Sequence, residues 1–205
     1  MAVNADENVQ TTIAIVGAGF AGIGMAVQLR KSGYEDFVIL EKAQDWGGTW
    51  RDNTYPGCGC DVPTALYSYS FEQNPNWSTL RSSQEEIHDY LRRVADKHGL
   101  SAKVLFETEA IEYSWAAEQS RWSIRLADGR TVSSQFIVMA IGPYPGANIP
   151  QFKGVETFAG PAFHSSRWDH GVSLEGKRVA VIGTGASAVQ LVPEIAGVVE
   201  ELQVY

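Results

Sequence analysis

Six residues near the N-terminus have the spacing G-x-G-x-x-G: Gly17, Ala18, Gly19, Phe20, Ala21 and Gly22. In such a turn the first glycine allows a tight bend, the second leaves room for a pyrophosphate, and the third lets a helix pack closely on a strand. Backbone N–H groups and the positive end of the helix then face the phosphates. The spacing predicts a dinucleotide-binding turn; the alternative is a turn that serves backbone geometry alone.

Glu41 supports the first interpretation. It follows Gly22 by 19 positions, close to the spacing of about 20 expected for an acid that binds ribose. A carboxylate there accepts hydrogen bonds from ribose hydroxyls and disfavours a 2′-phosphate. The first turn should therefore prefer FAD or NAD to NADP.

A second turn has the spacing G-x-G-x-x-A and consists of Gly183, Thr184, Gly185, Ala186, Ser187 and Ala188. Two such units in one chain predict two bound nucleotides, although a plain strand-to-helix turn is the alternative. Glu41 lies 24 positions after Gly17, and the same offset from Gly183 falls beyond Tyr205. The residues that would choose between NAD and NADP are therefore missing, and we expect the chain to be a fragment of a longer enzyme.

The predicted elements place each turn between a buried strand and a helix. The first unit has a strand at 12–16, a helix at 21–32 and a strand at 37–40; the second has a strand at 177–182, a helix at 186–196 and a strand at 199–205. Residues 42–82 form a long irregular segment, and a capping box at Ser83 begins a helix that runs to about residue 98. Further strands are predicted at 104–106, 109–115, 121–126, 131–133 and 135–140.

These elements predict an α/β protein with two Rossmann-like parts. After a flexible tail at 1–10, an FAD-binding domain should occupy 11–145, with a parallel sheet and a β-meander or hairpin insertion. A connector at 146–175 should lead to the start of an NADP-binding domain at 176–205. That incomplete unit should leave apolar faces uncovered, because parallel sheets need cover on both faces.

Composition argues against several classes of protein. The net charge is −8 at pH 7, which disfavours a nucleic-acid surface. No apolar run approaches the length of a membrane span, and the N-terminus lacks the features of a signal peptide. With only two cysteines, the expected location is the cytoplasm. Cys58 and Cys60 have C-x-C spacing and the four histidines are scattered, so neither a disulfide reductase nor a metal site is predicted.

The motifs together resemble class B flavoprotein monooxygenases. The resemblance is carried by GAGFAG at 17–22, GGTW at 47–50, YPGCGCDVP at 55–63 and GTGASA at 183–188. Residues 158–169 fit F-x-G-x-x-x-H-x-x-x-W-[PD], which is similar to the fingerprint of Baeyer–Villiger monooxygenases. The N-oxygenating branch usually has Phe or Tyr in place of Trp168. The resemblance covers nearly the whole chain but only about the first two-fifths of a typical member.

The resemblance implies FAD, NADPH and O₂ as reactants. Reduced flavin would add O₂ to form a C4a-peroxide, which would insert one oxygen atom into a ketone or another carbonyl compound to give an ester or lactone. The alternatives are an N- or S-oxygenating flavin monooxygenase and a non-catalytic FAD-binding fragment. We expect the isolated chain to be inactive, and its oligomeric state is not predicted.

Residue roles follow from the same resemblance. Asp61 and His164 are the catalytic candidates: Asp61 would be buried beside the flavin and pair with a later arginine, and His164 would help couple nicotinamide binding to domain motion. For His164 the alternative is a histidine that bonds the connector backbone. Cofactor contacts are further implied for Lys42, Gly48, Thr49, Trp50, Tyr67 and Ala110.

Overall fold

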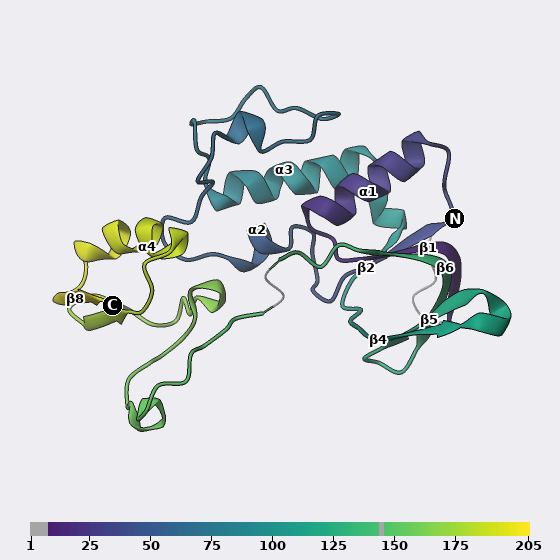
Figure 1. Cartoon of the computed structure of the whole chain (residues 1–205). Coiled ribbons are helices and arrows are strands. Elements are labelled where there is room, and N and C mark those ends of the chain that lie inside the picture. Colours follow the sequence, from purple (N-terminus) through teal and green to yellow (C-terminus); the bar gives the residue numbers. More distant parts are fainter. Residues whose placement is uncertain (1–7, 144–145) are drawn as a thin grey trace. The chain divides into compact units, whose positions relative to one another are not determined.

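The computed structural model describes residues 8–143 and 146–205, which form two compact units (Figure 1). Unit 1 comprises Met1–Arg51 and His88–Pro145, and unit 2 comprises Asp52–Ile87 and Gly146–Tyr205. Residues 52–87 cluster with the C-terminal part of the chain. The predicted domains at 11–145 and 176–205 stay predictions.

Unit 1 is built on a six-stranded sheet with the order β3-β2-β1-β6-β5-β4. Four neighbouring strands are parallel: β3 (Val104–Leu105), β2 (Phe37–Leu40), β1 (Val9–Val16) and β6 (Thr131–Met139). Two antiparallel strands follow β6: β5 (Arg121–Leu126) and β4 (Ala110–Ala116). This mixed sheet confirms the predicted α/β class.

Helices cover one face of the parallel strands, and the antiparallel end of the same sheet lies over the other face. α1 (Phe20–Lys31) and the part of α3 (Gln84–Lys97) that belongs to unit 1 lie on one side, and the β4–β5 hairpin lies on the other (Figure 1). Residues 13–16 of β1 and the whole of β2 are apolar and buried on both faces, as expected of a parallel sheet with cover on each side. The core under the hairpin contains side chains from the parallel strands and from the antiparallel strand β5. Its buried residues are Ala14, Val38, Leu40, Leu105, Ile124, Leu126 and Val132.

Two predicted boundaries in unit 1 were wrong. β1 begins at Val9, inside the expected tail, because Val9 and Gln10 pair with β6 at Val132 and Ser133. Residues 1–7 of that tail lie outside the described residues. The two strands predicted at 131–133 and 135–140 are one strand, because no turn interrupts the chain between them.

Only the first half of β6 has a strand on each side. β5 pairs with residues 131–134, whereas β1 pairs along nearly the whole strand. Within the described ranges, no strand pairs with residues 135–139 on the side away from β1. Phe136 and Met139 on this half are 61% and 51% exposed, so this edge presents both backbone groups and apolar side chains.

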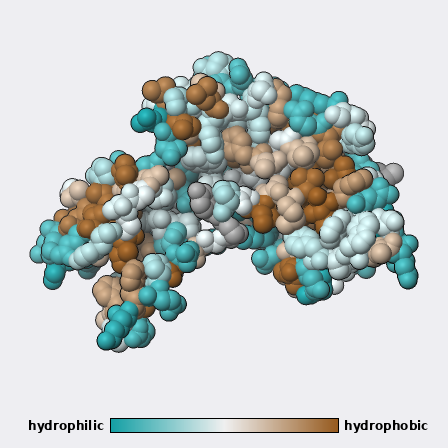
Figure 2. All heavy atoms as spheres, viewed as in Figure 1, coloured by the Kyte–Doolittle hydropathy of each residue, from teal (hydrophilic) through white to brown (hydrophobic). Residues whose placement is uncertain are grey.

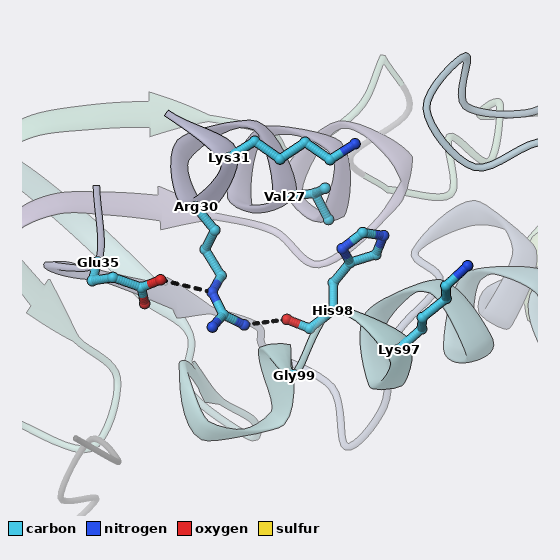
Figure 3. Close-up of a pocket in the computed structure, with 7 residues that line it drawn as sticks. All are labelled: Val27, Arg30, Lys31, Glu35, Lys97, His98 and Gly99. Carbon is cyan, nitrogen blue, oxygen red and sulfur yellow. Dashed lines mark hydrogen bonds and ion pairs between the residues drawn. The ribbon is translucent and has the colours of Figure 1, made fainter. Parts of the chain in front are cut away.

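A pocket lies at the C-terminal ends of α1 and α3 (Figure 3). Arg30 bridges it, since its guanidinium donates to the Glu35 carboxylate at 3.0 Å and to the carbonyl of His98. Lys31 and Lys97 line the same pocket, where positive side chains complement the negative ends of the helix dipoles. These basic residues therefore stabilise the contact between α1 and α3, at the end of α1 that is opposite the glycine turn.

Unit 2 contains a smaller parallel sheet. β7 (Arg178–Val181) pairs with β8 (Glu201–Val204), and α4 (Ala186–Ala196) connects them, as the second glycine motif predicts. Apolar side chains of this unit reach the surface (Figure 2), among them Ile182 and Val189, the latter 69% exposed. Both side chains belong to the second βαβ unit, where uncovered apolar surface was expected.

Residues 52–87 belong with unit 2 because their side chains complete its core. Tyr55 is buried together with Leu191 and Ile195 of α4, and Cys58 packs against the same cluster. No pattern within 42–82 indicated this association. The segment at 42–82, predicted to be irregular, also contains the short helix α2 (Thr49–Asp52).

Short 3₁₀ helices occur at Thr64–Leu66, Leu100–Ala102, Ala117–Gln119, Val155–Thr157 and Ser165–Arg167. None of the helices in the described residues is long and apolar enough to cross a membrane.

Candidate functional site

The first glycine turn joins the end of β1 to the start of α1, and two of its glycines are required by the chain itself. Gly17 has φ +104°, and a Cβ there would lie 2.5 Å from the carbonyl oxygen of Ala140. A Cβ on Gly22 would lie 1.9 Å from the carbonyl oxygen of Gly17. Both contacts are too short for a side chain, so these glycines let β1, α1 and β6 approach one another.

Gly19 is different, because nothing in the chain requires a glycine there. Its φ of −84° and ψ of −163° suit any residue, and a Cβ would come no closer than 3.7 Å, to the Cα of Gly48. Gly19 is the N-cap of α1, which has no side-chain cap and no acidic residue in its first turn. The bare positive end of a helix beside a Cβ-free position is a cradle that fits a pyrophosphate.

Glu41 points into this turn, as predicted. Its carboxylate accepts hydrogen bonds from the N–H of Ala18 at 2.8 Å and from the N–H of Ala43 at 2.9 Å. The side chain is nearly buried, with 4% of the residue exposed. The acid at the end of β2 is therefore held beside the cradle by the backbone on both sides.

Arg51 was not predicted as part of the site. Its guanidinium lies 3.1 Å from the Glu41 carboxylate and donates to the carbonyl of Asp45 at 2.7 Å. Both side chains of the Glu41–Arg51 pair are mostly buried, where a lone charge would be costly. The only local signal was that Arg51 directly follows the GGTW motif.

His88 was likewise missed, because the scattered histidines of the sequence indicated no site. Its Nε2 lies 2.8 Å from the carbonyl of Trp46, and its ring would collide with a Cβ on Gly47, 2.6 Å away. Gly47 has φ +116°, and its N–H donates to the carbonyl of Ala18 at 2.9 Å. His88 and Gly47 therefore hold the GGTW segment against the first turn, a contact between residues 41 positions apart.

The other predicted contacts of unit 1 fall into two groups. Gly48 lies beside Gly19, and Trp50 is buried in α2 close to Glu41's partner Arg51. Ala110 begins β4, two residues after Thr108, whose N–H donates to the carbonyl of Glu41 at 2.8 Å. These positions gather around the first turn. Side chains that lie at the surface are those of Phe20 (in part), Ala21, Lys42 and Thr49.

The second glycine turn has the same backbone form in a more open setting. Gly183 has φ +116°, and Gly185 is the N-cap of α4, again without a side-chain cap or an acidic residue in the first turn. A Cβ on either glycine would meet nothing within 4 Å. Ala188 occupies the third position, and Thr184 and Ala186 are exposed while Ser187 is half-buried. The turn is thus shaped for an anion but is not enclosed by the described residues of unit 2.

Asp61 is exposed, and its predicted place beside a flavin and a later arginine stays a prediction. It directly follows Cys60, whose N–H donates to the carbonyl of Ser82 at 2.9 Å, and it leads into the 3₁₀ helix at Thr64–Leu66. The loop therefore ends its close packing at Cys60 and turns outward at Asp61. Tyr67 is half-buried at the end of this 3₁₀ helix.

His164 caps a 3₁₀ helix in the connector. Its Nδ1 accepts a hydrogen bond from the N–H of Ser166 at 3.1 Å and lies 2.9 Å from the Ser166 hydroxyl. This is the backbone-bonding alternative considered for this histidine. Trp168 packs edge-on against Phe163, with ring centroids 5.1 Å apart, and it also packs against the core of unit 2.

The chain is similar to known proteins over almost its whole length. The family model described as pyridine nucleotide-disulphide oxidoreductase matches residues 14–204. A Baeyer–Villiger monooxygenase of Streptomyces coelicolor is 49% identical, and one of Pseudomonas aeruginosa is 47% identical, each over 94% of this chain. The chain spans 37% of the length of each of these relatives.

Solved structures agree with the sequence relatives. Cyclohexanone monooxygenase with bound epsilon-caprolactone has a TM-score of 0.90 and 34% identity, and the match covers 95% of this chain and 39% of that one. Oxidized steroid monooxygenase bound to NADP has a TM-score of 0.87 and 40% identity, and the match covers 96% of this chain and 38% of that one.

The family description includes disulphide oxidoreductases, whereas Cys58 and Cys60 are both free thiols here. The sequence relatives and the solved structures instead agree with the resemblance to flavoprotein monooxygenases. The chain belongs to the pyridine nucleotide-disulphide oxidoreductase family, and the two relatives named above are Baeyer–Villiger monooxygenases.

Proposed function

We propose that this chain is the nucleotide-binding part of an FAD- and NADPH-dependent monooxygenase of the Baeyer–Villiger type, which inserts one oxygen atom of O₂ into a ketone. The observation that carries the proposal is Gly19, a glycine that the chain does not need, at the bare N-terminus of α1 beside Glu41. A ligand that approaches the backbone closely explains the missing Cβ, and a pyrophosphate suits the helix end.

The residues of unit 1 would bind FAD. The amides at the start of α1 would hold its pyrophosphate, and Glu41 would bind its ribose in place of one of the amide hydrogen bonds that the carboxylate now accepts. Arg51, 3.1 Å from the carboxylate, would hold it in place through the exchange of partners. Gly48 and Trp50 would line the continuation of the cofactor beyond Gly19.

The residues of unit 2 would bind the second nucleotide. Gly185 and the first turn of α4 would hold the pyrophosphate of NADPH by the same backbone chemistry. When bound, the two cofactors supply the hydride and the reaction with O₂, while the chain orients them. Asp61, which is exposed here, would pair with a cationic group beside the flavin, and His164 would help couple nicotinamide binding to domain motion from its place at the cap of a 3₁₀ helix.

The test is an FAD titration of the 205-residue chain followed by flavin absorbance. Gly19→Val fills the cradle and should weaken FAD binding by about tenfold or more, because the pyrophosphate loses its close approach. Its folding should be nearly unchanged, since a Cβ there makes only ordinary contacts. Gly197→Val, at a glycine where a Cβ would meet nothing within 4 Å, is the matched control. Equal FAD affinity in the Gly19→Val variant would refute the site.

A further inference from the structure

A single glutamine of α4 holds the loop that precedes Asp61. The side-chain oxygen of Gln190 accepts a hydrogen bond from the hydroxyl of Tyr55 at 2.8 Å. Its side-chain nitrogen donates to the carbonyl of Gly59 at 2.9 Å, and the N–H of Gly59 lies 3.5 Å from the oxygen. Both ends of one amide are therefore used to bind two points of the loop at residues 55–60, all within unit 2.

The same loop lies directly on the backbone of α4. Gly57 has φ +76°, and a Cβ on it would lie 2.7 Å from the carbonyl oxygen of Gln190 and 2.7 Å from Cγ of Glu194. Tyr55 is buried against Leu191 and Ile195. The loop and the helix thus have no room to slide past one another, so a movement of either one is transmitted to the other.

The contact also reaches the second glycine turn. Burial raises the pKa of Tyr55 to about 12, and a hydrogen bond with the side chain of Ser187 opposes that rise. Ser187 belongs to the G-x-G-x-x-A motif, and Gln190 follows it by three positions, which places both on one face of the helix. Tyr55 therefore touches the glycine motif at one residue and the holding glutamine at another.

We propose that Gln190 is a positioning residue that couples the occupancy of the second glycine turn to the loop that ends at Asp61. The proposal rests on the proposed function, since it takes a dinucleotide as the occupant of that turn. A ligand that fixes the first turn of α4 also fixes Ser187 and Gln190, and through them Tyr55 and Gly59. By reciprocity, an ordered loop must favour the nucleotide by the same factor.

Two thiols inside the loop provide a direct measure of its order. Cys58 and Cys60 are the two cysteines of the chain. Cys58 is half-buried in the core of unit 2 and Cys60 is 4% exposed, and burial raises the pKa of both thiols. Because the thiolate is the reactive form, the closed loop should be alkylated slowly and an opened loop quickly.

The experiment measures the rate of iodoacetamide alkylation of the 205-residue chain with and without NADP⁺, and NADP⁺ affinity by calorimetry. In the unaltered chain, NADP⁺ should slow alkylation by about fivefold. In Gln190→Ala the rate without nucleotide should rise, and NADP⁺ should no longer slow it even where the calorimeter reports saturation. Gln203→Ala removes a glutamine of β8 that bonds Glu201 at 2.6 Å, and should behave as the unaltered chain.

Failure of the coupling and failure of the proposed function give different results. NADP⁺ that binds the unaltered chain without slowing alkylation overturns the coupling alone, as does full protection in Gln190→Ala. A chain that binds no NADP⁺ overturns the coupling and the assignment of the second turn, whereas the FAD site of the proposed function stands or falls by its own titration. If Gln190→Ala does not fold, Tyr55→Phe is the second variant, because it removes only the hydroxyl that donates to Gln190. Protection of the thiols by NADP⁺ should then be partly lost. Unchanged protection in Tyr55→Phe counts against the proposal.

Discussion

The two glycine turns of this chain share a sequence pattern but differ in what makes their glycines necessary. In the first turn, Gly17 and Gly22 each face a carbonyl oxygen at a distance that excludes a side chain. In the second turn, a Cβ on Gly183 or Gly185 would meet nothing within 4 Å, and Ala188 already stands where Gly22 does.

The difference follows from the surroundings of each turn. The first turn lies in a six-stranded sheet, where β6 passes beside the start of α1 and Glu41 reaches back from β2. The second turn joins β7 of a two-stranded sheet to α4, and its residues Gly183–Ala186 are exposed among the described residues of unit 2. One motif therefore combines packing with ligand binding, and the other depends on backbone conformation and the ligand alone. Stability measurements should separate these two roles.

The largest effect is expected from a methyl group at the third position of the first turn. Gly22→Ala should lower the free energy of unfolding by more than the about 3 kcal/mol usual for overpacking, because the new Cβ would lie 1.9 Å from a backbone oxygen. Gly185→Ala should change it by less than about 0.5 kcal/mol. Urea unfolding followed by tryptophan fluorescence measures both. Similar losses in the two variants would remove the distinction between the turns.

A smaller loss is expected when the acid of the first turn is neutralised. Glu41→Gln should cost about 2 kcal/mol, because one amide N–H must then face a backbone donor or Arg51 in a buried place. FAD affinity should fall as well. The control is Glu35→Gln, which removes an exposed partner of Arg30 and should leave the urea midpoint almost unchanged. Equal midpoints for both variants would show that Glu41 is not held as described.

The smallest effect concerns pH and unit 2. The pKa of Tyr55 is raised to about 12 in the folded chain, chiefly by burial. The unfolded chain releases this proton near the ordinary value of about 10. Stability from this group is therefore complete below pH 10 and is lost as the pH rises toward 12. Tyr55→Phe should make the urea midpoint less sensitive to pH between 9 and 11 than that of the unaltered chain, whereas Tyr34→Phe, at an exposed position, should not.

Local signals predicted most of the fold. The bounds of β2, β5 and α4 agree with the structure to the residue, because each is a strongly apolar or periodic segment bounded by glycine, aspartate or a charged turn. The placement of Glu41 at the first turn also followed from spacing alone. These features depend on residues within one βαβ unit, where sequence distance and spatial distance agree.

Contacts between distant segments could not be predicted. Arg51 reaches Glu41, and His88 reaches Gly47, through a loop whose path no periodicity describes. The association of residues 52–87 with α4 depends on Gly57 and Gln190, 133 positions apart. The exposure of Asp61 depends on where that packing ends, so a motif could name the residue but not its environment.

The half-paired strand β6 has a practical consequence for handling the chain. Its open backbone groups and the exposed Phe136 offer a template on which another extended segment can add, and the gain is largest in concentrated solution. Association of this kind would grow with protein concentration and would bury the edge without involving either glycine turn. Phe136→Lys should weaken this association, because it places a charge on the edge. Light scattering across a dilution series would compare the average particle mass of the variant with that of the unaltered chain.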